Sequence, residues 1–133
     1  MSSGFILLFI LAAIGPVAAG NCNTAPDVDG CSVKVNRWDL PPFFWDIFEP
    51  GCNKHDICYS CGAYYGVSRR LCDDHLYANN KKLCSTNTKV RHLSWCLQFA
   101  REYYLVWINF KHSYYKQTSP GWCSQSYVAD CIF

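Results

Sequence analysis

The apolar positions of the chain form one short run at its start and, further along, three stretches with helical spacing. The run extends from Phe5 to Ile14 and is followed by Pro16 and several small residues. This pattern is typical of a secretory signal peptide, and the run is too short to cross a membrane. We therefore expect residues 1–20 to be a signal peptide and residues 21–133 to form one small domain.

The next segment favours a loop over a long helix or strand. Residues 21–50 contain four residues that interrupt regular elements, namely Pro26, Gly30, Pro41 and Pro42. We expect a helix to begin near Pro50, because proline suits the first turn of a helix. This helix should continue to about Tyr65 and end near Gly66.

A second helix is expected from Arg69 to Cys84. Ser68 is a suitable N-cap for it, and Lys81 and Lys82 suit its C-terminal end, where the helix dipole favours positive charge. Its buried stripe is expected to come from Leu71, Tyr77 and Leu83.

A third and longer helix is expected from Lys89 to about His112. We expect its repeated Tyr and Trp side chains to lie in the core. The large apolar residues of this stretch are Leu93, Trp95, Phe99, Tyr103, Val106 and Trp107. The tail from Gly121 to Phe133 is short, and we expect disulfides of Cys123 and Cys131 to attach it to the rest. The sequence thus predicts a mainly α domain.

The cysteine content indicates how such a small domain is stabilised. An even number of cysteines in a small secreted chain indicates a disulfide framework, and each bridge adds about 2–5 kcal/mol of stability. The pairing remains open, because ten cysteines allow very many combinations. The spacing Cys58-x-x-Cys61 also permits a zinc or redox site, but the secretory context favours disulfides. All ten cysteines follow the predicted signal peptide: Cys22, Cys31, Cys52, Cys58, Cys61, Cys72, Cys84, Cys96, Cys123 and Cys131.

The net charge and the aromatic content bear on which binding partners to expect. A net charge of +2 gives no reason to expect nucleic acid as a partner. Aromatic residues make up 17% of the chain, and eight residues, Pro41 to Phe48, are rich in them. These side chains can cap the core or face a lipid surface, and the sequence leaves both interpretations open.

Candidate catalytic chemistry centres on His55 and Asp56, which are neighbours in the first predicted helix. Side chains of adjacent helical residues point about 100° apart, so these two cannot form a hydrogen-bonded pair with each other. They suit two separate tasks, proton transfer by His55 and cation binding by Asp56. An acid on the second helix would then orient the imidazole, and both Asp73 and Asp74 are candidates.

A calcium ion is the cation that this arrangement favours. Calcium prefers oxygen ligands, and Asp56, Asp29 and the carbonyl of Gly30 can supply them. A bridge between Cys31 and Cys52 would bring the upstream loop onto the helix and place Asp29 near Asp56. The ion would polarise an ester carbonyl while His55 activates water.

Several motifs, in order along the chain, resemble the conodipine-type phospholipases A2 of cone-snail venoms. The same motifs resemble the small phospholipase A2 domain of bacterial and fungal secreted enzymes. They are Asp29-Gly30-Cys31-Ser32, then Pro50-Gly51-Cys52-Asn53-Lys54-His55-Asp56-Ile57-Cys58-Tyr59, then Arg70-Leu71-Cys72-Asp73-Asp74, and finally Cys96 with Ala100, Tyr103, Tyr104 and Val106.

The resemblance implies a small, disulfide-rich phospholipase A2-like fold with two antiparallel helices carrying the active site and a third long helix. It further implies that His55 is the catalytic base and Asp73 its partner, and that Asp56, Asp29 and the Gly30 carbonyl bind calcium. The expected substrate is the sn-2 ester of glycerophospholipids at a membrane surface. The expected protein is a secreted monomeric venom component.

Two departures from related enzymes limit the resemblance. The glycine-rich calcium loop and the double cysteine of the pancreatic and snake-venom enzymes are missing, so the chain resembles a different branch. Asn79-Asn80 replaces the Asp-Met pair that is usual later in the second helix. Some conodipines are cut into two chains, but the basic pairs here lie inside predicted helices, so one chain is expected.

An alternative interpretation is that the chain has the phospholipase A2-like fold but not the hydrolytic activity. In that case the protein is a toxin that binds a membrane receptor or ion channel with little or no hydrolysis. The presence of every proposed catalytic and calcium-binding residue favours the enzyme.

Overall fold

The computed structural model describes residues 20–31 and 42–133, which are mainly helical and contain no strand, as the sequence predicts. The three long helices are α1 (Pro42–Tyr65), α2 (Arg69–Thr86) and α3 (Leu93–Phe110). Shorter elements follow as η1 (His112–Tyr114), η2 (Gly121–Ser124) and α4 (Val128–Cys131). Most of the predicted signal peptide lies outside the described residues, so the domain boundary at residue 20 stays a prediction.

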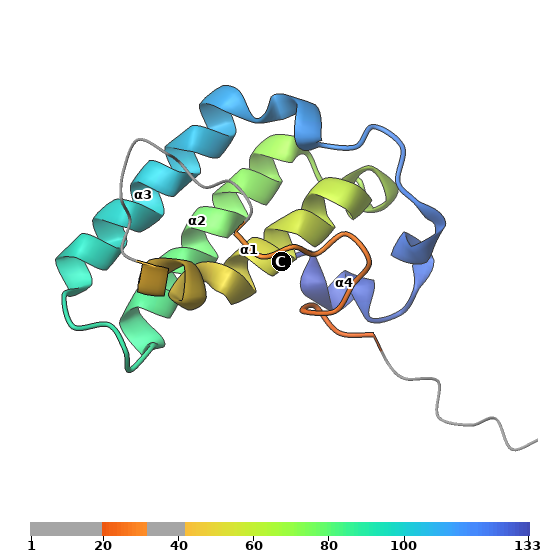
Figure 1. The fold of residues 1–133 in the computed structure, drawn as a ribbon. Helices are drawn as coiled ribbons and strands as arrows, with labels where there is room; N and C mark the ends of the chain where they lie inside the picture. Colours follow the sequence, from red (N-terminus) through yellow and green to blue (C-terminus); the bar gives the residue numbers. More distant parts are fainter. Residues whose placement is uncertain (1–19, 32–41) are drawn as a thin grey trace, which may run out of the picture.

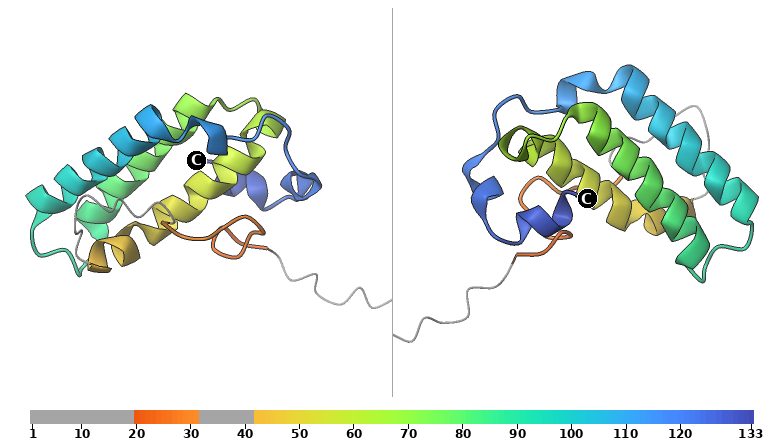
Figure 2. Two further views of the ribbon diagram at one scale, coloured as in Figure 1. Left: turned by 45° about the horizontal axis from the view of Figure 1, so that its top comes forward. Right: turned by 180° about the vertical axis from the view of Figure 1, so that it is seen from behind.

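The long helices pack side by side, with α2 antiparallel to both of its neighbours (Figure 1). Both views in Figure 2 keep this order, and the C-terminal elements η2 and α4 lie against α1. Side chains of α3 also contact α1 directly, because the Phe44 and Phe99 rings lie 4.6 Å apart and the His55 and Trp107 rings 4.3 Å apart. Helix α1 thus contacts α2, α3, η2 and α4.

Helix α1 begins at Pro42, and the prediction of a loop up to Pro50 is wrong for residues 42–49. Phe44, Ile47 and Phe48 form a helical stripe and are buried. Burying each such side chain stabilises the fold by about 1.5–3 kcal/mol, whereas an interior proline costs about 3 kcal/mol. The summed burial outweighs the cost of Pro50. Phe44 and Phe48 therefore belong to the core; Pro41 lies outside the described residues.

Helix α2 begins as the sequence predicts but buries a different face. The Ser68 hydroxyl accepts a hydrogen bond from the Leu71 backbone N–H at 3.1 Å, which is an N-cap. Leu71 itself is exposed, and Tyr77 and Leu83 are half-buried. The prediction of the stripe is wrong because disulfide cysteines and polar groups face α1 and α3: Cys72, Asp73, Leu76, Asn80 and Cys84.

The close approach of α1 and α2 requires a glycine at position 51. A Cβ atom there would lie 2.1 Å from Oδ1 of Asn80, far inside contact distance. Asn80 is buried against this glycine. Asn80, one of the two residues of the Asn79-Asn80 departure, is therefore part of the helix interface.

Helix α3 is shorter than predicted, because it starts at Leu93 and ends at Phe110. Its buried residues are Cys96, Ala100, Tyr103 and Trp107, which follow helical spacing. Leu93 and Trp95 in its first turn are exposed, so the expectation of a core position is wrong for Trp95.

Five disulfides use all ten cysteines and connect nearly every described element. Cys58–Cys72 joins α1 to α2, and Cys84–Cys96 joins α2 to α3. The tail is attached as expected, through Cys61–Cys123 and Cys22–Cys131. The fifth bridge, Cys31–Cys52, holds the N-terminal loop on α1.

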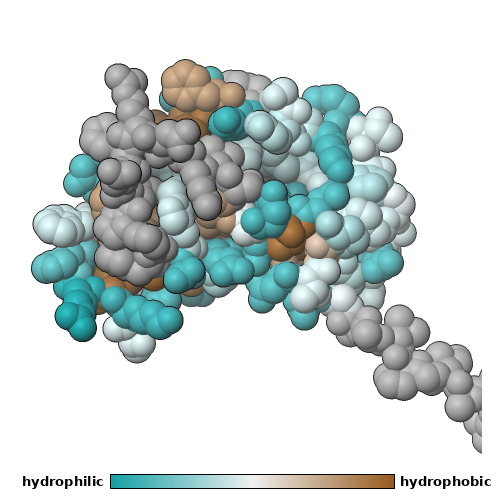
Figure 3. Space-filling model, viewed as in Figure 1, coloured by the Kyte–Doolittle hydropathy of each residue, from teal (hydrophilic) through white to brown (hydrophobic). Residues whose placement is uncertain are grey.

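The coloured residues on the face seen in Figure 3 are mostly hydrophilic, with hydrophobic residues in small separate areas. None of the helices in the described part of the chain combines the length and apolar character that crossing a membrane requires.

Candidate active site

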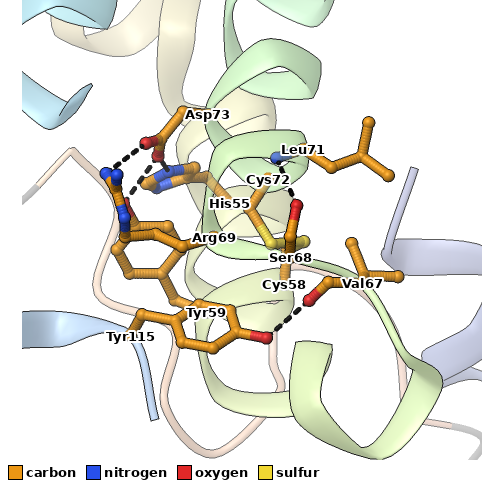
Figure 4. The surroundings of a disulfide bond; sticks show 10 residues. All are labelled: His55, Cys58, Tyr59, Val67, Ser68, Arg69, Leu71, Cys72, Asp73 and Tyr115. Atoms are coloured by element: carbon orange, nitrogen blue, oxygen red, sulfur yellow. Dashed lines mark hydrogen bonds and ion pairs between the residues drawn. A yellow bond between two sulfur atoms is a disulfide. The ribbon is translucent and has the colours of Figure 1, made fainter. Parts of the chain in front are cut away.

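His55 of α1 and Asp73 of α2 face each other across the helix interface (Figure 4). The Nε2 atom of His55 lies 2.8 Å from Oδ1 of Asp73, and both side chains are buried. The Cys58–Cys72 bridge joins the same two helices one turn away and fixes their separation at this point. Asp74, the alternative acid, points to the surface, where it accepts hydrogen bonds from Arg70 and Tyr104.

Two further side chains bind Asp73. The Tyr59 hydroxyl donates to Oδ1 at 2.6 Å, and Nη1 of Arg69 donates to Oδ2 at 3.1 Å. Neither was predicted as a site residue. Spacing offered a signal for both, since Tyr59 lies four residues after His55 and Arg69 four residues before Asp73, each on the same helix face.

The surroundings of His55 favour the neutral imidazole. The Tyr59 and Trp107 rings lie 4.2 Å and 4.3 Å from its ring, and His55 is only 3% exposed. Burial lowers the pKa of His55, and the Asp73 carboxylate partly offsets this by favouring the charged form. Because Asp73 accepts the Nε2 proton, Nδ1 is the nitrogen that can take up another proton.

The loop before residue 32 is held on α1 beside this pair. The Asp29 backbone N–H donates to Oδ2 of Asp56 at 3.1 Å, and the Gly30 N–H donates to Oδ1 of Asn53 at 3.1 Å. Gly30 has a φ of +69°, a left-handed conformation that favours glycine. The Cys31–Cys52 bridge completes the attachment, so the loop and helix meet where the sequence places the candidate calcium ligands.

Asp56 is strongly affected by this arrangement. Burial, together with the nearby Asp29 and Asp27 carboxylates, raises the pKa of Asp56 to about 8, although the Asp29 N–H opposes the rise. Two acidic groups held this close repel each other when both are ionised, and a divalent cation would relieve that repulsion.

The donor set fits calcium better than zinc. In the described part of the chain no three His, Cys, Asp or Glu side chains gather as a metal cluster. Calcium accepts backbone carbonyls and water beside carboxylates, so Asp29, Asp56 and the Gly30 carbonyl remain a suitable set. Zinc at Cys58-x-x-Cys61 is excluded, because each cysteine is in its own disulfide, with Cys72 and Cys123 respectively.

An open cleft of about 240 Å³ lies over the two carboxylates. Asp29 and Asp56 line it together with Tyr59 and Trp107, the two residues whose rings contact His55. The remaining lining residues, none of them predicted from the sequence as site residues, are Asp27, Ser60, Tyr114 and Lys116. Asp27 accepts hydrogen bonds from both Ser60 and Lys116 at 2.7 Å, which fixes this wall of the cleft.

Comparison with known proteins identifies relatives among the conodipines. The chain is 44% identical over 56 residues to Conodipine-P2 of Conus purpurascens, which covers 42% of this chain and 29% of that protein. It is 37% identical over 63 residues to the Conodipine-M alpha chain of Conus magus, which covers 44% of this chain and 79% of that one. No family model and no solved structure matches the chain.

The two matches differ in extent. This chain spans less than a third of the length of Conodipine-P2 and of Conodipine-P1, also from Conus purpurascens. It spans most of the Conodipine-M alpha chain. Identity of this level over most of that relative, together with the mainly α, disulfide-rich fold, leads to one conclusion: the chain belongs to the conodipine family.

Proposed function

We propose that the protein is a secreted, calcium-dependent phospholipase A2 that hydrolyses the sn-2 ester of glycerophospholipids. The observation that carries this proposal is the buried contact of 2.8 Å between His55 and Asp73. The Tyr59 and Trp107 rings that contact His55 also line the cleft of the Asp29 and Asp56 carboxylates. The relationship to the conodipines supports the same reaction class. Five disulfides support an oxidising, extracellular location, and the Conus relatives support venom as the source.

His55 is the general base of the proposed reaction. Its Nδ1 takes a proton from water as the water oxygen attacks the ester carbonyl, and Asp73 stabilises the imidazolium that forms. The imidazolium then returns the proton to the departing alcohol. Calcium, when bound by Asp29, Asp56 and the Gly30 carbonyl, supplies positive charge that polarises the ester carbonyl.

The test is release of fatty acid from phosphatidylcholine vesicles with added calcium and with excess chelator. We expect activity that disappears with chelator. His55→Gln should lower kcat at least about a thousandfold, because it removes the base. His92→Gln, which changes an exposed histidine outside the site, should retain full activity. Survival of turnover in the His55→Gln variant would rule out this mechanism.

The proposed substrate lies in a membrane, and the segment that contributes Tyr114 to the cleft carries exposed aromatic side chains. Phe110 is 76% and Tyr114 59% exposed, and Tyr114 also lines the cleft. Lys111 places its ammonium group 5.5 Å from the Tyr114 ring centroid. Exposed aromatic side chains next to a cation suit the boundary of an anionic lipid surface. We call Phe110, Lys111 and Tyr114 the rim.

Phe110→Ser should weaken binding to vesicles that contain phosphatidylglycerol by roughly tenfold, because an apolar side chain no longer enters the lipid. Trp95→Ser is the matched control, since Trp95 is 58% exposed at the opposite end of α3. Sedimentation with vesicles measures both affinities. Equal losses in the two variants would contradict a lipid contact at the rim.

A second candidate function is a toxin that binds a membrane receptor or ion channel without hydrolysis. One observation favours it: His55 is almost fully covered, so a substrate must displace part of its aromatic surroundings. The vesicle assay separates the two functions, because absence of fatty-acid release with or without calcium would support the toxin.

A further inference from the structure

Asp73 divides its two carboxylate oxygens between different partners. Oδ1 accepts hydrogen bonds from His55 and Tyr59, whereas Oδ2 is bound by Arg69 at 3.1 Å. We propose that Arg69 is a positioning residue of the active site, which fixes the Asp73 carboxylate and balances its charge so that Oδ1 stays directed at His55.

The charge balance of the buried pair requires a cation. Asp73 is completely buried, and an ionised carboxylate without a partner is costly in such a place. Neither of the partners on Oδ1 supplies a permanent charge, because Tyr59 is a neutral hydroxyl and His55 must be neutral to accept a proton. Arg69 is charged at all relevant pH values and is therefore the residue that balances Asp73.

The second oxygen also matters for orientation. Without Arg69, Oδ2 would lose the hydrogen bond that it makes in the buried interface, and the carboxylate could turn about its terminal torsion. Such a turn would misdirect Oδ1 from His55. A change of this kind affects the transition state more than substrate binding, because Asp73 acts on the imidazolium that forms during reaction.

The local sequence places Arg69 firmly. The Ser68 cap makes Arg69 the first residue of α2, and Asp73 follows one turn later on the same face. The preceding turn is fixed as well, because the Tyr115 hydroxyl donates to the Val67 carbonyl (Figure 4). The backbone that carries Arg69 is therefore fixed before and after this residue, and only 24% of the Arg69 side chain is exposed.

The adjacent pair in the chain provides an internal comparison. Arg70 and Asp74 have the same i, i+4 spacing and a similar distance of 3.2 Å, but the Arg70 side chain is 63% exposed. Pairs of this kind contribute little in water. Arg70→Gln is therefore a matched control for Arg69→Gln, with the same chemical change one residue away.

The kinetic part of the test rests on the proposed function. With phosphatidylcholine vesicles and calcium, Arg69→Gln should lower kcat at least about tenfold and leave KM within about twofold. Arg69→Lys should give an intermediate kcat, because it keeps the charge but loses the planar fork. Arg70→Gln should match the wild type.

A second measurement does not depend on turnover. The Nε2 proton of His55 that is bound to Asp73 should give a downfield proton resonance in NMR spectra at fixed pH. Arg69→Gln should shift or broaden this resonance, and Arg70→Gln should leave it unchanged. A wild-type protein with this resonance but no hydrolysis would refute the proposed function while leaving the role of Arg69 to be decided by the NMR comparison.

A double-mutant cycle tests whether Arg69 affects kcat through Asp73. If Arg69 acts through Asp73, Arg69→Gln should add almost no further loss of kcat in an Asp73→Asn background. If the kcat losses of the two single variants multiply in the double variant, the proposal is overturned. It is also overturned if Arg69→Gln keeps both the wild-type resonance and the wild-type kcat. If Arg69→Gln fails to fold, Arg69→Lys tests the proposal in its place. A wild-type kcat and a wild-type His55 resonance in Arg69→Lys would overturn the proposed role of Arg69.

Discussion

At the scale of single residues, the site depends on acidic groups held in unlike environments. Asp73 is buried among donors, Asp56 lies beside other carboxylates, and Asp74 is exposed. The sequence proposed all three as candidates; the residues alone left both Asp73 and Asp74 open, and the family resemblance favoured Asp73. The N-cap at Ser68 sets the register of α2, and the structure shows that this register directs Asp73 toward α1. Tyr59 and Arg69 were not predicted, although their four-residue spacing from His55 and Asp73 was a signal, because the contact of Tyr59 with Asp73 joins two helices and the role of Arg69 follows from the burial of Asp73.

If Asp56 is a calcium ligand, as proposed, its protonation should make calcium binding sensitive to pH. Its pKa of about 8, against an ordinary 3.8, means that the folded protein retains a proton between these values that the unfolded chain releases. For this group, stability without calcium is greatest below pH 3.8 and falls as pH rises toward 8. Calcium must displace the proton, so its affinity should increase about tenfold from pH 6 to pH 7 and level off above about 8.

Isothermal titration with calcium at several pH values measures this effect. Asp56→Asn should abolish binding at every pH, whereas Asp74→Asn, at an exposed carboxylate outside the cleft, should behave as the wild type. An affinity that does not vary between pH 6 and pH 8 would contradict the role of Asp56.

At the scale of elements, helix spacing predicted the three long helices, and tertiary contacts decided their ends and faces. The start of α1 was missed because Pro50 looks like a helix start, whereas the burial of Phe44 and Phe48 extends the helix to Pro42. The buried face of α2 was missed because cysteines and polar residues fill it in place of leucines. Local sequence patterns do not reveal which cysteines pair, and the disulfide pairs determine which face of α2 is buried.

The two disulfides of α2 should separate stability from activity. Cys58–Cys72 and Cys84–Cys96 close loops of similar length, with sequence separations of 14 and 12. Removing either pair by double alanine substitution should cost about 3 kcal/mol of unfolding free energy. Only loss of Cys58–Cys72 should also lower kcat severalfold, because that bridge lies next to the contact between His55 and Asp73.

Chemical denaturation and the vesicle assay measure the two quantities in parallel. The prediction fails if the Cys84–Cys96 variant loses as much kcat as the Cys58–Cys72 variant while both remain folded.

At the scale of the whole molecule, the family motifs predicted the fold class, and the cysteine count predicted that disulfides stabilise it. The cleft was not predictable from them, because its walls combine the N-terminal loop, α1, the end of α3 and the segment after it. Trp107 and Lys116 reach the cleft only when the helices pack as three neighbours. Residues this far apart in sequence leave no local pattern.

The bridge between Cys22 and Cys131 encloses almost the entire described chain. A protease that breaks any one peptide bond between these positions leaves two pieces that remain covalently attached. The molecule can therefore pass from a single polypeptide to a nicked heterodimer without dissociating. After a cut between Cys61 and Cys123, the bridge between these two cysteines is a second covalent link between the two pieces.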